Sequence, residues 1–543
     1  MTLLGQTSAW SGIPVGEHLW VFSPMIALIA TMLAVVACPI VVGRSARTIA
    51  RVATLGVIVT LGLTLATWGE VSTNPVSGLS TQPTSGMLIA DNLSIGFQVI
   101  LMVFLLGVIY LWKIGSAGSE ENAPEFFILL LGSALGMILM VSTSNLLMIV
   151  LGIEMASLPS YAIVGFNKRD RKGAEASVKY MIFGAVCAAI MLYGVSLLYG
   201  MVGSLSVADL ARYTVEQFAG GQHPLLLSVG LLCLLVGPAF KISAVPFHFW
   251  CPDAFEGARI EVTTWLSVAS KAAGLILLAR MVSTFAGAVD EPLAMSVLKP
   301  LAWTIGIMAA VTCTLGNFAA YPQQSVKRLL AYSSIAHAGY MMMAVAVFLH
   351  PQADRSGEPM AALMFYIIVY VFMNLGAFGV TALVSWETGS DRIEGFTGLM
   401  RRAPWLAVPM VVCLISLVGL PPMAGFLAKW WVLVALGSLA DGWGANLAWF
   451  LIIVAVVNTL ISLYYYLRIV VVMTLRDTGE PVIRSPIGGL ALVNFCALML
   501  LALLVVSAPL KATADRFSRN LFDATTVTQP AGEPVAAALD RAD

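Results

Sequence analysis

The sequence has 543 residues, of which 59% are hydrophobic and 11% charged, and its formal net charge is zero. An ordinary soluble domain carries about 25% charged residues, so this chain has too few charges to cover a water-exposed surface. The composition predicts a polytopic membrane protein. The zero net charge argues against a nucleic-acid surface. The seven scattered cysteines form no CxxC motif or Cys/His cluster, which argues against an iron–sulfur site.

Apolar runs of about 20 residues are long enough to cross a bilayer as helices. Such runs predict an all-α protein with fourteen transmembrane spans, in chain order 20–43, 49–69, 87–112, 125–142, 145–166, 176–201, 223–250, 262–285, 301–320, 328–349, 360–386, 405–436, 446–473 and 487–509.

Basic residues are distributed unequally between the loops that join these spans. Sixteen Lys and Arg residues lie in alternate loops, whereas only Arg212, Arg280, Lys299 and Arg355 lie in the opposite ones. Because basic loops stay on the inner side of a membrane, this asymmetry supports fourteen spans with both termini outside. The polar residues after about 510 are expected to form a loosely ordered tail.

Two predicted spans contain a proline break beside a lysine and a group of aromatic residues. LVGPAFKISAVPFHFWCPD (235–253) carries Lys241 between two prolines, and GLPPMAGFLAKWW (419–431) carries Lys429 after two consecutive prolines. The two spans are five apart, so they run in opposite directions. Broken helices at corresponding places in oppositely oriented halves are typical of inverted-repeat transporters.

Four ionisable residues lie near the centres of spans: Glu154, Lys241, Lys271 and Lys429. Each costs about 2.5–3.5 kcal/mol at mid-membrane, so they must face the protein interior or a hydrated cavity. A lysine in a low dielectric holds its proton weakly, and a nearby carboxylate strengthens its hold. Movement of Glu154 relative to Lys241 would therefore act as a charge-controlled proton gate. A static structural ion pair is the alternative interpretation.

Lys179, His248 and His337 are secondary candidates for proton transfer. Lys179 lies near the end of its span and could instead extend to the surface. Each histidine is either a proton relay or an ordinary core residue. The prolines of the first broken span free backbone carbonyls, for which water, Ser243 and His248 are the expected partners. Asp253, at the inner mouth, is expected to be solvated.

The run AFKISAVPFHFWCPDAFEGA resembles a signature of the antiporter-like membrane subunits of respiratory complex I (NADH–quinone oxidoreductase), most closely those of the N type. NKRDRKGAEASVKYMIFGA, LYGVSLLYGMVGSLS, VKRLLAYSSIAHAGY and GLPPMAGFLAKWW are similar to the same family in order and spacing. Together these motifs cover predicted spans 5 to 12. The resemblance implies fourteen helices with two inverted five-helix repeats, spans 4–8 and 9–13.

The resemblance also implies a division of the chain and a role for each buried charge. Residues 1–115 would form three N-terminal helices, 125–285 a proton-intake repeat, 301–473 a proton-exit repeat, 487–509 the last helix and 510–543 a polar tail. Glu154 and Lys241 would be the paired residues of spans 5 and 7, Lys271 the central lysine, and Lys429 the lysine near the exit. Lys179 and His337 match further polar positions of the same row of residues in the family.

The implied function is that of a proton-translocating subunit of the membrane arm, without a redox centre. No cofactor is expected in this chain, because NADH, FMN, iron–sulfur clusters and quinone belong to partner subunits in the family. The expected neighbours are an M-type antiporter-like subunit and small K- and J-type subunits, in an energy-transducing membrane such as the bacterial inner membrane. Two alternatives remain: a subunit of a multisubunit Na⁺/H⁺ antiporter, or the membrane subunit of a hydrogenase.

One stretch departs from the family pattern. The family usually reads EGAPTPVTA after span 7, whereas this chain reads EGARIEVTT. Arg259 and Glu261 replace the two prolines, so the inner loop and the start of span 8 are expected to differ.

Overall fold

The computed structural model describes residues 20–41, 43–73, 87–116, 122–167, 169–219, 225–287, 291–349, 358–439, 444–476, 481–483 and 485–518. In these residues the regular structure is helical, apart from two isolated β-bridges. The predicted all-α class is confirmed. Arg355 and the part of the predicted tail beyond residue 518 lie outside the described residues.

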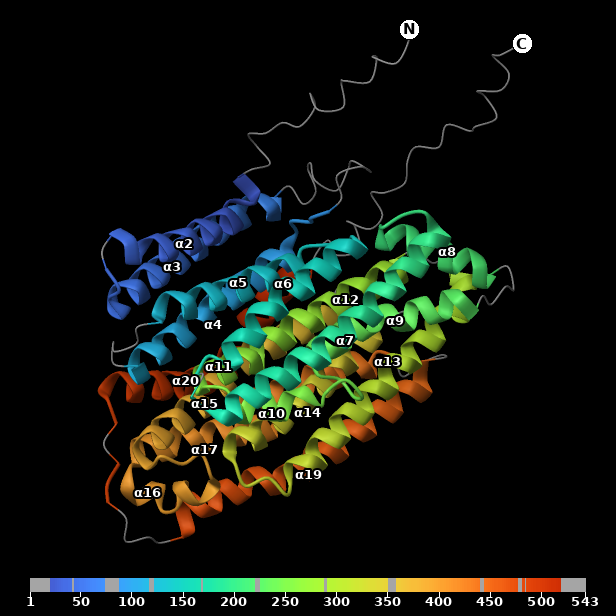
Figure 1. The fold of residues 1–543 in the computed structure, drawn as a ribbon. Helices are drawn as coiled ribbons and strands as arrows, with labels where there is room; N and C mark the ends of the chain where they lie inside the picture. Colours follow the sequence, from blue (N-terminus) through green and yellow to red (C-terminus); the bar gives the residue numbers. More distant parts are fainter. Residues whose placement is uncertain are drawn as a thin grey trace, which may run out of the picture.

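Thirteen of the described helices are long and apolar enough to cross a membrane, and two shorter apolar helices, α17 and α18, together occupy the remaining predicted span. The protein is therefore a multi-pass membrane protein, and the fourteen predicted spans are confirmed. The first three are α2 (Ser23–Val41), α3 (Ala46–Thr73) and α4 (Asn92–Ser116), which lie along one edge of the molecule (Figure 1).

The next five spans begin with α5 (Ala123–Val141), α6 (Leu146–Val164), α7 (Arg171–Val202) and α9 (Leu225–Ile242). The fifth is a composite helix of α11 (Ile260–Trp265), the π-helical segment η1 (Leu266–Ser270) and α12 (Lys271–Gly287). Two shorter helices, α8 (Val207–Ala219) and α10 (Trp250–Gly257), lie between these spans in the sequence. The sequence analysis had not predicted α8, whose amphipathic pattern marks a surface helix.

The second half contains α13 (Glu291–Ala320), α14 (Val326–Val347), α15 (Glu358–Thr388), α17 (Pro404–Val418), α18 (Ala424–Gly437), α19 (Ala445–Leu475) and α20 (Ile487–Val505), with the short η2 (Ile393–Phe396) and α16 (Leu399–Arg402) between α15 and α17. A last helix, α21 (Ser507–Ser518), follows α20. The expectation of a loosely ordered tail is wrong for this segment, which packs against α15 and α4.

The same helix-pair contact occurs in both halves of the chain. A Cβ added to Gly136 on α5 would lie 2.2 Å from the backbone of Ala156 on α6, and one added to Gly316 on α13 would lie 2.6 Å from the backbone of Ala336 on α14. Both contacts are therefore backbone-to-backbone approaches that only glycine permits. Gly316 lies 180 residues after Gly136 in the chain, and Ala336 lies 180 residues after Ala156. Such a recurrence is what two structural repeats produce.

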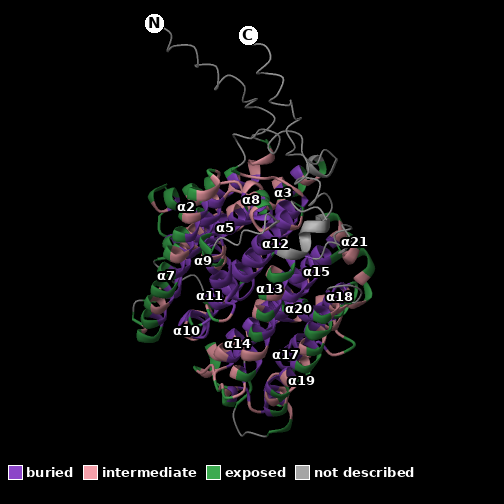
Figure 2. Ribbon diagram, turned by 90° about the vertical axis from the view of Figure 1, so that its right-hand side faces the viewer, coloured by how far each residue is buried: buried purple, intermediate pink, exposed green. Residues whose placement is uncertain are grey.

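The composite helix α11–η1–α12 runs through the centre of the molecule and is buried along its length (Figure 2). Outer helices such as α3, α7 and α19 instead expose large apolar side chains, including Leu55, Phe183 and Leu460. A surface of this kind matches a hydrocarbon environment, where apolar side chains need no covering.

The first broken span ends earlier than the predicted range 223–250. Helix α9 stops at Ile242, and Ser243 adopts a left-handed φ of 64° that no regular helix accommodates. The freed carbonyl of Phe240 accepts a hydrogen bond from the Trp250 indole at 3.1 Å, and that of Lys241 accepts one from the Ser270 hydroxyl at 3.3 Å. The expected side-chain partners Ser243 and His248 form neither bond; Ser243 instead donates its backbone N–H to the Phe240 carbonyl at 3.0 Å.

One buried charge escaped the sequence analysis. Arg280, which was counted with the loops although the predicted span 262–285 contains it, lies inside α12 with only 5% of its surface exposed. Its guanidinium donates two hydrogen bonds to Asp91, at 2.7 and 2.9 Å. Burial acts to raise the pKa of Asp91, but Arg280 and the hydrogen bonds with Ser94 outweigh it and hold the pKa below its ordinary value. This ion pair ties α12 to the start of α4.

Candidate functional site

Lys241 lies at the end of α9, just before the chain turns, and its side chain is fully buried. Its ammonium donates a hydrogen bond to the Ser157 hydroxyl on α6 at 3.1 Å. No carboxylate of the described residues forms an ion pair with it. The predicted partner Glu154 is one helical turn before Ser157 and close enough to interact with Lys241 electrostatically.

Glu154 is only partly buried, whereas Lys241 is closed off from the surface. The neighbours of Glu154 on the same side of α6, Leu151 and Leu158, are 51% and 60% exposed. The carboxylate thus lies at the border between the protein interior and an exposed apolar helix face. A change on that face could alter the charge near Lys241 without disturbing the core.

Lys271 directly follows the π-helical segment η1 in the central helix and is fully buried. Its ammonium lies 3.5 Å from the Cys251 thiol, 4.8 Å from the ring centroid of Phe255 and 5.7 Å from that of Trp250. Aromatic faces attract a cation without neutralising it. The site therefore stabilises the charged form of Lys271 only in part, and no counter-ion for it lies among the described residues. Short π-helical segments of this kind are frequent at functional sites.

The helices that carry Lys241 and Lys271 approach each other closely. A Cβ added to Gly274 on α12 would lie 3.3 Å from the Cβ of Lys241, and the Ser270 hydroxyl donates to the Lys241 carbonyl. The absence of a side chain at Gly274 thus leaves room for Lys241 against the central helix. The structure brings together the residues predicted on spans 5, 7 and 8.

A row of side chains continues from Lys271 into the second half of the chain. Tyr370 on α15 lies near Cys251, the contact partner of Lys271, and the ring of Tyr370 lies 5.2 Å from that of His337 on α14. The Tyr370 hydroxyl is buried, with Asn374 and Ser334 as polar neighbours. The junction between the halves is therefore polar.

His337 is buried and surrounded by tyrosines. Its Nδ1 lies 2.7 Å from the Tyr366 hydroxyl and its Nε2 3.3 Å from the Tyr466 hydroxyl. The Tyr466 hydroxyl also hydrogen-bonds with Ser333. Hydroxyl and imidazole groups both donate and accept hydrogen bonds, so this series of hydrogen-bonded side chains can pass a proton in either direction.

Lys429, on α18, binds the end of the other broken helix. Its ammonium donates to the carbonyl of Val418, the last residue of α17, at 2.8 Å, and lies 3.5 Å from the Thr459 hydroxyl. It also lies 4.3 Å above the ring centroid of Tyr340, whose hydroxyl hydrogen-bonds with Thr459. Tyr340 is on the same helix as His337, with their rings 6.0 Å apart. Lys429 therefore adjoins the tyrosine–histidine cluster.

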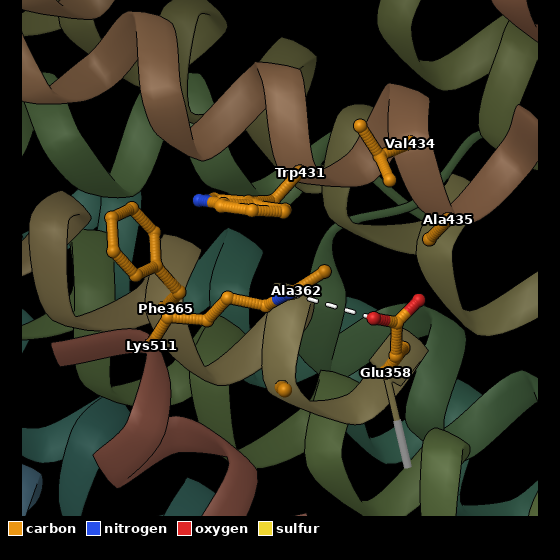
Figure 3. Close-up of a pocket in the computed structure, with 8 residues that line it drawn as sticks. Glu358, Ala362, Phe365, Trp431, Val434, Ala435 and Lys511 are labelled. Carbon is orange, nitrogen blue, oxygen red and sulfur yellow. Dashed lines mark hydrogen bonds and ion pairs between the residues drawn. The ribbon is translucent and has the colours of Figure 1, made fainter. Parts of the chain in front are cut away.

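A small cavity lies two residues beyond Lys429, where Trp431 faces α15 and α21 (Figure 3). Its volume of about 10 Å³ is close to the space needed for one water molecule. Lys511 of α21 lies 3.9 Å above the Trp431 ring and 3.5 Å from the Glu358 carboxylate. This ion pair closes the end of the cavity that faces α21.

Lys179 lies outside the buried row. Its side chain is 44% exposed and forms ion pairs at 2.9 Å with Glu175 and with Asp253. Asp253 also accepts a hydrogen bond from Arg328 at 2.7 Å, so the expectation that it is merely solvated is wrong. Burial acts to raise the pKa of Asp253, but the hydrogen bonds from Lys179 and Arg328 outweigh it and lower the pKa. These charges link α7, α10 and α14 at one end of the bundle.

The departure at Arg259 and Glu261 leaves the local backbone compatible with the family pattern. Helix α11 begins at Ile260, and Arg259 precedes it with a φ of −58°, which a proline would also adopt. Glu261 lies in the first helical turn, where a carboxylate is favoured, and Arg259 lies 3.4 Å from it. The Glu261 side chain is only 2% exposed, yet it borders a polar cavity of about 310 Å³ that Lys327 and Asp391 also line. The expected change is therefore one of charge and not of backbone shape.

His248 is buried in the turn after α9, and its ring lies 4.4 Å from that of Phe249. Its Nδ1 has no hydrogen-bond partner within the described part of the chain. The structure brings it into contact with none of the lysines of the row. No group of three His, Cys, Asp or Glu side chains suited to a metal ion occurs among the described residues.

Several members of the row could not be chosen from the sequence: Ser157, Cys251, Tyr340, Tyr366, Tyr370, Thr459 and Tyr466. They are neutral residues of types that are common in membrane helices. A weak signal existed for Tyr340 alone, because it belongs to the motif that also contains His337. The charged members, in contrast, were evident from the cost of burying them.

Comparison with known proteins places the chain in a defined family. A family model described as NADH:quinone oxidoreductase/Mrp antiporter, transmembrane, matches residues 143–462. NADH-quinone oxidoreductase subunit N 2 of Sorangium cellulosum is 42% identical over 427 residues, which are 76% of this chain and 80% of that protein.

Solved structures agree with this match. A chain of respiratory complex I from Thermus thermophilus superposes with a TM-score of 0.70 at 30% identity, covering 90% of this chain and 98% of that one. A chain of the Mrp complex from a Dietzia species has a TM-score of 0.77 at 20% identity, covering 94% and 99%. The latter identity is low enough to show the fold alone. On the matched sequence and the shared architecture, this chain belongs to the NADH:quinone oxidoreductase/Mrp antiporter transmembrane family.

Proposed function

We propose that the chain is the N-type antiporter-like subunit of a complex I-type NADH:quinone oxidoreductase and moves protons across the membrane. The observation that carries this proposal is the row of buried ionisable groups from Glu154 through Lys241 and Lys271 to His337 and Lys429. Its members are joined by hydroxyl, thiol and aromatic contacts. Burial of several cations without a hydrogen-bonded carboxylate is costly, and a role in charge transfer would account for that cost.

The row suggests how charge would move. When the carboxylate of Glu154 interacts strongly with Lys241, that lysine keeps its proton; when the interaction weakens, the proton is released toward Lys271. His337 and its tyrosines would carry protons across the junction, and Lys429 would pass them toward the end of α18. Residues 125–285 would serve intake and 301–473 exit. NADH oxidation, quinone reduction and their cofactors would belong to partner subunits.

The relatives support complex I over the alternatives. The 42% identical relative carries the name of a subunit of NADH-quinone oxidoreductase, whereas the Mrp chain matches at 20% identity, a level that shows only fold. The excess of basic residues in alternate loops favours both termini on the outer side of the membrane, and the bacterial relative supports a bacterial inner membrane. Neighbouring M-type and small K- and J-type subunits would complete the membrane arm.

Purification of the tagged full chain from its membrane tests the proposal. The assembly is expected to oxidise NADH with quinone and, in sealed proteoliposomes, to acidify one side in an uncoupler-sensitive way. Copurification only with antiporter subunits, without NADH oxidation, would contradict it. A hydrogenase as the partner would contradict it equally.

A further inference from the structure

A recess between the N-terminal helices and the second half of the chain is separate from the row of charges. It has a volume of about 340 Å³ and lies between α3, α4, α15 and α20. Its walls are almost wholly apolar, formed by side chains that include Val103, Leu106, Phe372, Leu375 and Phe495. Val103 and Phe495 are 42% and 52% exposed, so the recess opens toward the lipid-facing surface. It is of the size that holds part of an apolar ligand.

One end of the recess is cationic. Lys113, in the last turn of α4, lines it, and its ammonium donates a hydrogen bond to the Thr54 hydroxyl at 2.7 Å. The nearest charge that acts on Lys113 is Arg51, which is also positive. Within the described residues, no carboxylate forms an ion pair with Lys113. One cation and a hydroxyl thus lie at this end of the recess, and a second cation, the exposed Arg51, is near enough to act on Lys113 electrostatically.

The position of this end agrees with a membrane interface. Lys113 and Arg51 belong to the basic loops of the chain, together with the exposed Arg44 and Arg47. The apolar wall extends from Lys113 along α4 toward Val103, ten residues or about 15 Å of helix away. A ligand that fills the site therefore needs a negatively charged head at the interface and a long apolar chain in the hydrocarbon region.

We infer that this recess binds an anionic phospholipid. The phosphate would contact Lys113, Arg51 and the Thr54 hydroxyl, and an acyl chain would lie along the recess against Phe372 and Phe495. Basic pockets between transmembrane helices are known to bind anionic headgroups in this way. The lipid fills a seam between α4 and the helices α15 and α20. It would thereby join the three N-terminal helices to the second half.

The test measures lipid retention by the assembly that copurifies with the tagged full chain. Native mass spectrometry counts bound phosphatidylglycerol and phosphatidylcholine after exchange into mixed micelles that contain both lipids in equal amounts. The parent is expected to retain phosphatidylglycerol preferentially. Lys113→Gln is expected to weaken its binding about fivefold, the effect of one basic side chain near a membrane surface. Lys113→Arg keeps the charge and is expected to restore the parent level.

Two further variants separate a built site from general surface charge. Arg44→Gln removes an exposed cation of the same end outside the recess, and lipid retention is expected to stay at the parent level. Val103→Trp fills the exposed mouth of the recess and is expected to lower retention with Lys113 intact. The inference is overturned if the parent shows no preference, if Arg44→Gln acts as strongly as Lys113→Gln, or if Val103→Trp has no effect. Binding of a neutral decylquinone in place of phosphatidylglycerol would also overturn it.

Discussion

Replacing Lys241 by methionine distinguishes a proton-carrying lysine from one half of a static ion pair. Breaking a buried ion pair on one side costs about 3–5 kcal/mol, because the remaining charge is left uncompensated. In this structure the ammonium of Lys241 bonds to the neutral Ser157 hydroxyl at 3.1 Å, and Glu154 is only partly buried. Loss of the lysine therefore removes a hydrogen bond to a neutral group and does not break a hydrogen-bonded ion pair.

The expected change in stability follows from two opposing terms. The lost hydrogen bond from a charged donor costs about 1.5–3 kcal/mol. Exchange of a buried ion for a well-packed apolar side chain of similar volume is neutral or stabilising by about 1–4 kcal/mol. The two terms nearly cancel, so Lys241→Met is expected to change the free energy of unfolding by less than about 1 kcal/mol.

The assay compares stability and pumping in one preparation. Thermal unfolding of the purified assembly reports stability, and proton uptake per electron in proteoliposomes reports pumping. Lys241→Met is expected to keep the parent stability and to lose most of its pumping, with Lys299→Met as an exposed-lysine control. A destabilisation of 3 kcal/mol or more, as given by a broken pair, together with unchanged pumping, would refute the reasoning.

Three other predictions follow from the same contacts. Lys179→Ala is expected to leave pumping near the parent level, because this exposed lysine stands outside the row; a loss as large as that of Lys241→Met would contradict this placement. Phe255→Leu removes a ring 4.8 Å from Lys271 and is expected to slow pumping several-fold, in keeping with about 0.5–2 kcal/mol for a cation–π contact; an unchanged rate would argue against it. Arg280→Met is expected to destabilise the fold by about 3–5 kcal/mol, measured by thermal unfolding, with the loss reduced in the double variant with Asp91→Asn. Since the pKa of Asp91 is lowered on folding, the contribution of this pair is complete above about pH 3.9 and is lost as the pH falls through the folded-state pKa; a pH-independent difference between parent and double variant would contradict it.

The sequence was sufficient to predict the spans and the charged residues of the row. Hydropathy and loop charge depend only on local composition, so the fourteen spans were found, with the largest differences at the end of α9, Ile242, and at the start of α13, Glu291. Lys241, Lys271 and Lys429 were conspicuous because a buried cation is costly wherever it points. The roles of these residues remain predictions.

The contacts of those charges could not be read from the sequence, because they depend on helix rotation and on distant segments. Ser157 meets Lys241 across 84 residues, and Trp250 satisfies a carbonyl ten residues away through a turn at Ser243. The π-helical segment before Lys271 has no sequence signature. Arg280 was counted with the loops although span 262–285 contains it, and its partner, Asp91, is 189 residues distant in the chain.

We expect the two halves of the chain to form one proton path joined at Lys271. The most direct test is the number of protons moved per electron by an assembled complex carrying Lys271→Met, with electron transfer to quinone measured in the same vesicles. The account predicts a ratio well below that of the parent while the complex stays intact. A parent ratio in a verified, fully assembled complex would contradict it.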